Sequence, residues 1–232
     1  PTTAAPAAGT RERIVLLYSP SGSGKTSLIQ AKLVPQLEAR HFRVLGPMQV
    51  GLERVTAPDM TQAHSDVNQY LASALQSLEA KLPLEKQLGL ADLVGLDLGG
   101  YLRKRGWLGK SAPRLALIFD QFEEIITVNP NDHNGKTVFF EHIGELLRGS
   151  DDGPPMWAVF SMREEYIAAL EQYLRPIPTR LGNTLRIDRL DINNAQLAIQ
   201  RPAESKNVPF TQDALVQLVK DLSKEQVQLP NG

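Results

Sequence analysis

The stretch LLYSPSGSGKTSLIQ, residues 16–30, decides the fold class of this chain. An apolar run of strand length leads into a loop of glycine and serine, and an amphipathic run follows. Gly22 and Gly24 allow the tight path that points several backbone N–H groups at one spot, and the N-terminus of the next helix adds partial positive charge. Lys25 supplies a full charge for the terminal phosphates of a nucleotide, and the Thr26 hydroxyl can ligate Mg²⁺. The stretch therefore predicts a phosphate-binding loop.

The usual pattern of such loops is G-x-x-x-x-G-K-[ST], and this chain has Ser19 in place of the first glycine. Pro20 follows, and a residue before proline is held in extended geometry, which serine adopts without strain. We therefore expect the substitution to be tolerated. The simpler alternative, a surface turn with an incidental lysine, is disfavoured by the flanking strand and helix. The residues expected to contact the nucleotide are Ser21, Gly22, Ser23, Gly24, Lys25, Thr26 and Ser27.

Length and composition fit one globular domain with room for a small second one. The chain has 232 residues, a formal net charge of −1 and no cysteine. The near-neutral charge carries no electrostatic signature of nucleic acid or anionic membrane, and without cysteine there are no disulfides or thiolate metal sites. The apolar runs are too short to cross a bilayer. We expect a cytoplasmic protein with no membrane partner, and nucleic acid is not an expected partner.

Strand-length apolar runs alternate with helical patterns, which predicts an α/β fold with a doubly wound parallel sheet. The expected strands cover residues 13–19, 42–51, 114–121, 156–163 and 183–190. The expected helices cover residues 25–40, 61–82, 90–106, 136–149, 164–174, 193–204 and 211–222. Pro35 should kink or interrupt the first helix, and the third should break at Gly99-Gly100. The second strand should break near Gly46-Pro47.

The last two helices follow one another without a strand between them, which indicates the start of a helical subdomain. The first residues are small, polar and rich in proline and alanine, as in a linker. We therefore expect a disordered linker at 1–11, a P-loop nucleotide-binding domain at 12–190 and a partial helical subdomain at 191–232.

The segment LALIFDQFEE, residues 115–124, predicts the second half of the site. Asp120 ends an apolar run, so it lies at the carboxyl end of a buried strand, where ligands bind in open parallel sheets. There it can hold Mg²⁺ and complete the metal site that Thr26 begins. Glu123 and Glu124 follow, and either can orient an attacking water; we favour Glu124. The alternative, a solvated acidic turn, loses weight beside the upstream phosphate loop.

The segment AVFSMREEY, residues 158–166, repeats this arrangement. A buried strand ends there, and Arg163 then projects at the same edge of the sheet. A cation at that place can contact the γ-phosphate and stabilise charge in the transition state, which makes Arg163 a candidate catalytic residue alongside Lys25. The alternative is a surface arginine paired with Glu164 or Glu165. The next candidates for the same role are Arg180 and Arg186.

Four segments together resemble the STAND class of signalling P-loop ATPases: SPSGSGKTSLI, LALIFDQFEEI, AVFSMREEY and TLRIDRLDINNAQLAIQRPAE. The resemblance covers about residues 12–232 and is closest to the novel STAND branch, which occurs in bacterial multidomain proteins. It implies a sheet of the additional-strand type with strand order 5-1-4-3-2, followed by a helical domain that packs over the adenine.

The resemblance also implies roles for single residues. Lys25 and Thr26 take the Walker A positions, Asp120 and Glu124 the Walker B positions, and Arg163 the sensor position. Ser19 departs from the family pattern, in which a glycine stands at the start of the loop.

Pro202 takes the place of the family's adenine-contacting proline, and Gln200 stands where the family often has glycine. The implied ligands are ATP or ADP with Mg²⁺. The implied function is that of a slow, ATP-hydrolysing signalling switch whose nucleotide state controls conformation and self-association. Such a core belongs to a longer chain that carries effector and sensor domains.

From the sequence, two other functions stay open. The first is a nucleotide-holding interaction module with negligible turnover, although the presence of both glutamates favours hydrolysis modestly. The second is a DNA-handling ATPase of the AAA+ or origin-recognition kind. In those proteins the acid strand usually ends in adjacent Asp-Glu, whereas Gln121 intervenes here.

Overall fold

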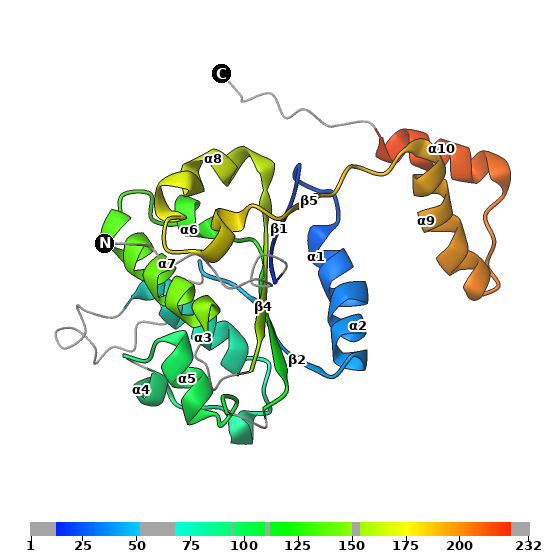
Figure 1. Cartoon of the computed structure of the whole chain (residues 1–232). Helices are drawn as coiled ribbons and strands as arrows, with labels where there is room; N and C mark the ends of the chain where they lie inside the picture. Colours follow the sequence, from blue (N-terminus) through cyan, green and yellow to red (C-terminus); the bar gives the residue numbers. More distant parts are fainter. Residues whose placement is uncertain (1–12, 52–67, 94, 110–111, 150–153, 224–232) are drawn as a thin grey trace. The chain divides into compact units, whose positions relative to one another are not determined.

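A computed structural model describes residues 13–51, 68–93, 95–109, 112–149 and 154–223 (Figure 1). The described residues contain five parallel strands: β1 (Ile14–Ser19), β2 (Phe42–Met48), β3 (Arg114–Phe119), β4 (Met156–Arg163) and β5 (Thr184–Arg186). They form one sheet in the order β2-β3-β4-β1-β5, which confirms the predicted order. The expected linker at 1–11 and the start of the helix expected at 61–82 lie outside the described residues.

Helices cover both faces of the sheet (Figure 1). On one face lie α1 (Lys25–Leu28) and α2 (Val34–Ala39), joined by a π-helical turn, Ile29–Leu33. On the other lie α3 (Gln69–Glu79), α5 (Leu98–Lys104) and α7 (His133–Arg148). The shorter helices of this unit are α4 (Leu90–Leu93), α6 (Glu124–Thr127) and α8 (Ile167–Leu170). Short 3₁₀ turns cover Leu84–Lys86, Glu164–Tyr166, Glu171–Tyr173 and Pro178–Leu181.

An aromatic cluster fixes the turn that follows β3. Phe119 stacks on Phe160 of β4 with ring centroids 5.0 Å apart, and Phe122 packs against the same ring at 4.9 Å. The backbone N–H of Phe122 also donates to the carbonyl of Ser161 at 2.8 Å. Because Phe122 is fully buried, the acidic residues on either side of it have little freedom to move.

Several predicted elements differ from the observed ones. The break in the region 90–106 lies before α5, not at Gly99-Gly100, because the Asp97 side chain caps α5 by accepting from the N–H of Gly100. The helix expected at 164–174 consists of α8 between two 3₁₀ turns. Pro35 does not stop its helix; the π-helical turn precedes it, and the helical path resumes as α2.

The two edge strands differ most from their predicted lengths. Strand β2 ends at Met48, and its pairing with β3 shifts register between Leu45 and Met48, around the Gly46-Pro47 pair. Strand β5 spans three residues, Thr184–Arg186, and pairs with β1 alone among the described strands. Both lie at edges of the sheet, where one side of the strand has no neighbour to extend the pairing.

The chain divides into two compact units, Pro1–Ile187 and Asp188–Gly232. The second unit contains α9 (Ile192–Ser205) and α10 (Gln212–Leu222). Asp191 caps α9, and Thr211 caps α10. Among the described helices of both units, none combines the length and apolar character that crossing a membrane requires.

Candidate functional site

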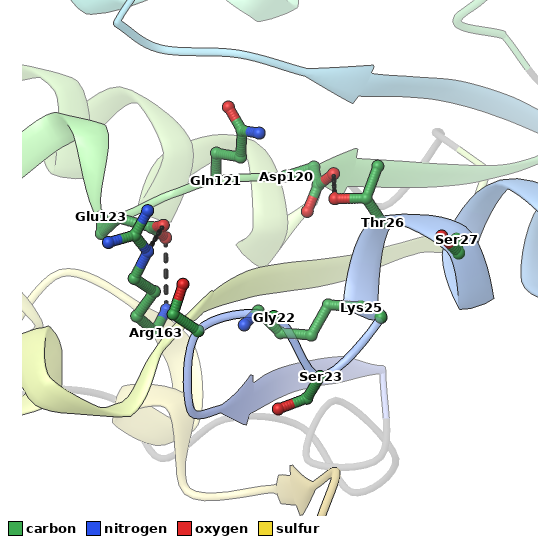
Figure 2. A pocket seen from close by; sticks show the side chains of 11 residues that line it. Gly22, Ser23, Lys25, Thr26, Ser27, Asp120, Gln121, Glu123 and Arg163 are labelled. Carbon is green, nitrogen blue, oxygen red and sulfur yellow. Dashed lines mark hydrogen bonds and ion pairs between the residues drawn. The ribbon is translucent and has the colours of Figure 1, made fainter. Parts of the chain in front are cut away.

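A pocket of about 200 Å³ opens at the carboxyl edge of the sheet (Figure 2). Its walls come from the β1–α1 loop and the ends of β3 and β4. It brings together all seven expected phosphate-loop residues, the expected metal ligand, one of the two glutamates and the expected sensor arginine. The lining residues are Ser21, Gly22, Ser23, Gly24, Lys25, Thr26, Ser27, Asp120, Gln121, Glu123 and Arg163.

The backbone of the loop has the conformation that its glycines were expected to provide. Gly22 has φ 78° and Gly24 has φ 83°, a left-handed region that residues with a side chain seldom adopt. Ser23 stabilises the turn, because its hydroxyl donates to the carbonyl of Pro20 at 2.8 Å. Helix α1 begins directly after Gly24. The loop thus has the geometry of an anion cradle at the start of a helix.

Ser19, which replaces the usual glycine, contacts Lys25 of the same loop. Lys25 Nζ donates to Ser19 Oγ at 2.8 Å and lies farther from the carbonyl oxygens of Ser19 and Pro20, at 3.4 and 3.5 Å. The Ser19 residue is fully buried. The sequence predicted that serine would be tolerated here, but not that its hydroxyl would hold the ammonium group inside the loop.

Thr26 and Asp120 meet across the pocket, as the sheet-edge argument predicted. Thr26 Oγ1 donates to Asp120 Oδ2 at 2.7 Å (Figure 2). Because the hydroxyl proton points at the carboxylate, the lone pairs of Thr26 Oγ1 stay available on the other side.

These oxygens suit Mg²⁺, which prefers a few hard oxygen ligands and completes its shell with water and substrate phosphates. Among the described residues, no group of three or more His, Cys, Asp or Glu side chains could hold a metal ion. A site of one hydroxyl and one carboxylate beside a phosphate loop is the kind that Mg²⁺ occupies together with a nucleotide.

Asp120 has a second partner that the sequence analysis missed. Ser161 Oγ donates to Asp120 Oδ1 at 2.7 Å, and Ser161 is fully buried in β4. The two residues are 41 positions apart, so no local spacing connects them. The available signal was a polar residue inside an otherwise apolar strand, two positions before Arg163.

Arg163 pairs with Glu123, not with either of its sequence neighbours. Arg163 Nε lies 3.1 Å from Glu123 Oε1, and the Arg163 backbone N–H donates to Glu123 Oε2 at 3.2 Å (Figure 2). Glu123 is 7% exposed, whereas the Arg163 side chain is 45% exposed and borders the pocket. Glu164 is engaged elsewhere, because it pairs with Arg186 at 3.1 Å.

Glu124 points away from this pocket. Its Oε2 accepts a hydrogen bond from the backbone N–H of Gly51 at 3.1 Å, and Glu124 is not among the lining residues. Partial burial raises the pKa of the Glu124 carboxyl, and the nearby Glu123 and Asp120 raise it further. A Cβ at Gly51 would lie 2.7 Å from the Glu124 Cβ, so the contact requires glycine at position 51.

Two further arginines and a proline were candidates for nucleotide contacts. Arg180 and Arg186 are not among the residues that line the pocket. Pro202 is an exposed residue inside α9, in the second unit of the chain.

The sequence profile of the family described as novel STAND NTPase 1 matches residues 3–231. The chain belongs to the novel STAND NTPase 1 family. The resemblance found from four motifs is thereby confirmed, and this STAND protein is a nucleotide-binding NTPase with a P-loop fold. No curated protein matches the chain.

A solved structure of low sequence identity shows the same fold. A Walker-type ATPase of Pyrococcus abyssi has a TM-score of 0.55 and 14% identity, over 90% of this chain and 58% of that one. The ORC2 protein of Aeropyrum pernix has a TM-score of 0.49 and 14% identity, over 86% of this chain and 47% of that one. The STAND chain thus spans little more than half the length of the Pyrococcus protein.

Proposed function

We propose that this STAND protein binds ATP and ADP with Mg²⁺, hydrolyses ATP slowly, and changes conformation with the nucleotide state. The observation that supports it most directly is one pocket lined by the phosphate loop, Asp120, Glu123 and Arg163. These groups come from three separate strand ends, and phosphoryl transfer needs this combination: an anion cradle, a metal ligand, a carboxylate for water and a cation for the transferred group.

Each group has a part in hydrolysis. The loop N–H groups and Lys25 hold the phosphates, and Thr26 and Asp120 are the residues that would hold Mg²⁺. The ion, when bound, neutralises charge on the β- and γ-phosphates. A glutamate orients the attacking water and accepts its proton as the new oxygen–phosphorus bond forms and the bond from the γ-phosphorus to the bridging oxygen breaks. Inorganic phosphate and ADP are the products.

The pocket geometry favours Glu123 as the residue that orients the attacking water. Glu123 lines the pocket, whereas Glu124, which the sequence favoured, is turned toward the Gly51 backbone. Glu123 is held by Arg163 in this structure, so it becomes available when the guanidinium moves to another anion. The γ-phosphate of ATP offers such an anion next to Arg163, and ADP does not.

The proposed switch follows from competition between Glu123 and the γ-phosphate for the Arg163 guanidinium. ATP draws Arg163 from Glu123 and ADP leaves the pair intact, so the two nucleotides stabilise different arrangements of the same edge of the sheet. The available bias is a coupling free energy on the order of 1–3 kcal/mol.

The finer parts of the proposal rest on family membership. Pro202 contacts the adenine, and the nucleotide state sets the conformation of the helical unit and the self-association of the ATPase core. Effector and sensor domains lie elsewhere in a longer cytoplasmic chain.

A nucleotide-holding module with negligible turnover is the second candidate, and one observation favours it. Both glutamates are engaged, Glu123 by Arg163 and Glu124 by Gly51. If neither is released when ATP binds, the site holds nucleotide without hydrolysing it.

Calorimetry with ATP and ADP, paired with steady-state phosphate release, tests both candidates. Lys25→Ala should weaken the binding of both nucleotides by several kcal/mol, because charge-assisted contacts to phosphate are strong. The matched control is Lys32→Ala, an exposed lysine on the same helical path that does not line the pocket. Binding with phosphate release supports the switch, and binding without it supports the module. If the wild-type protein binds no nucleotide, both candidate functions are contradicted.

A further inference from the structure

Both carboxylate oxygens of Asp120 are held by hydroxyl groups from different parts of the fold. Thr26 donates to Oδ2 from the start of α1, and Ser161 donates to Oδ1 from the middle of the sheet, each at 2.7 Å. Asp120 itself is only 5% exposed, so water has little access to replace either partner. The orientation of the Asp120 carboxylate is therefore fixed by a hydrogen bond to each of its two oxygens.

The backbone that carries the Ser161 hydroxyl is held in place by the sheet. In β4, Ser161 lies opposite Leu17 of β1 in the parallel register, and its carbonyl accepts from the N–H of Phe122 at 2.8 Å. Its backbone is thus held within the central strand β4 and by the hydrogen bond from the turn after Asp120. A fully buried serine with one proton donates it in one direction, here to Asp120 Oδ1.

We infer that Ser161 is a positioning residue for the metal–nucleotide site, an inference that rests on the proposed function. By holding Oδ1, it keeps Oδ2 turned toward Thr26 and the pocket. Oδ2 in turn accepts the Thr26 proton, which leaves the Thr26 lone pairs facing outward to a metal ion. Without the Ser161 hydroxyl, the carboxylate can rotate, and both oxygens of the metal site lose their alignment.

The alternative is that Ser161 only satisfies a buried carboxylate and affects stability alone. The two roles differ in what they change. Loss of a partner that orients a metal ligand commonly lowers metal affinity by about 10-fold or more, whereas a purely structural hydroxyl changes the melting temperature and leaves metal dependence as it was.

The test measures the affinity of a methylene-bridged ATP analogue over a series of free Mg²⁺ concentrations and in EDTA. Ser161→Ala should raise the Mg²⁺ concentration for half-maximal tight binding by about 10-fold. Its affinity in EDTA should stay within about twofold of wild type, because the phosphate loop is untouched. Ser161→Thr, which keeps the hydroxyl, should restore the wild-type Mg²⁺ dependence, and Ser161→Cys serves if threonine does not fold.

Two comparison variants make the outcome decisive. Asp120→Asn removes the carboxylate charge and should lose the Mg²⁺ dependence altogether. Ser77→Ala removes another buried hydroxyl, one that donates to Ala74, and should leave the Mg²⁺ dependence unchanged. If Ser161→Ala matches wild type while Asp120→Asn does not, the inference is overturned and the proposed function stands. If wild type itself shows no Mg²⁺-dependent binding, both the proposed function and the inference are contradicted.

Discussion

Arg163 and Glu123 form an ion pair at the wall of a pocket that is shaped for phosphate, with Arg163 Nε 3.1 Å from Glu123 Oε1. The Arg163 backbone N–H holds the other carboxylate oxygen at 3.2 Å. Because the backbone bond does not depend on the side chain, the guanidinium can leave Glu123 while the end of β4 keeps its place. The pair therefore combines a fixed anchor with a movable charge.

Arg163→Ala should lower ATP affinity and leave ADP affinity nearly unchanged, since the contact that we propose for the guanidinium is with the γ-phosphate alone. The expected loss for ATP is about 5-fold to 150-fold, the range of a coupling of 1–3 kcal/mol. Calorimetric titration of both nucleotides against both proteins measures it. Arg186→Ala is the matched control, an arginine at the end of β5 that pairs with Glu164. Equal losses for ATP and ADP would show that Arg163 does not sense the γ-phosphate.

Glu123→Gln should slow ATP turnover by about 100-fold, within the usual contribution of a general base, and should not weaken nucleotide binding. Glu124→Gln should have a much smaller effect on turnover, because Glu124 contacts Gly51 and not the pocket. Single-turnover phosphate release, with enzyme in excess over ATP, compares the two variants directly. If Glu124→Gln is the slower enzyme, Glu124 is the residue that orients the water, as the sequence favoured.

Glu124 also predicts a pH dependence of stability. Burial raises the pKa of its carboxyl in the folded protein above the ordinary value of 4.5, so the folded state binds this proton more readily than the unfolded state does. The contribution of Glu124 to stability is therefore least favourable at neutral and alkaline pH and recovers as the pH falls through the folded-state pKa.

Glu124→Gln removes that dependence and keeps an acceptor for the Gly51 N–H. The variant should melt about 1–3 °C above wild type at pH 8, and the difference should shrink as the pH falls toward the ordinary carboxyl range. Thermal melts from pH 8 to pH 5 measure it. Glu141→Gln, at an exposed position on α7, is the control and should show no such trend. A gain that does not depend on pH would assign the effect to packing.

The sequence predicted contacts that follow from topology. Thr26 and Asp120 are 94 positions apart, yet their meeting was predictable, because the carboxyl ends of neighbouring parallel strands and the loop after β1 share one edge of the sheet. The seven phosphate-loop residues and Arg163 were placed at the pocket by the same argument.

Contacts that depend on side-chain rotamers were not predictable. The bonds of Ser161 to Asp120 and of Ser19 to Lys25 depend on which way a short hydroxyl turns, and no periodicity encodes that. The choice between the glutamates depends on where α6 begins. The helix starts at Glu124, so Glu123 stays on the turn beside the pocket while Glu124 faces the end of β2.

The contact between Ser19 and Lys25 yields the last prediction. The Lys25 ammonium lies 2.8 Å from Ser19 Oγ, closer than to the carbonyl oxygens of Ser19 and Pro20. Entering phosphates compete with that hydroxyl for the ammonium. Ser19→Ala removes the competitor and should raise the affinity for ADP and ATP about fivefold, equivalent to about 1 kcal/mol for a net hydrogen bond.

A double-mutant cycle isolates this effect. Ser19→Ala should raise affinity in the wild-type background and change nothing in the Lys25→Ala background, because the hydroxyl acts only through the ammonium. Ser19→Gly, which restores the usual loop residue, should behave like Ser19→Ala. A fall in affinity on Ser19→Ala would mean that the hydroxyl keeps its bond to Lys25 in the nucleotide complex and steers the ammonium toward the phosphates. An equal gain in both backgrounds would mean that Ser19 acts on the loop backbone and not on Lys25.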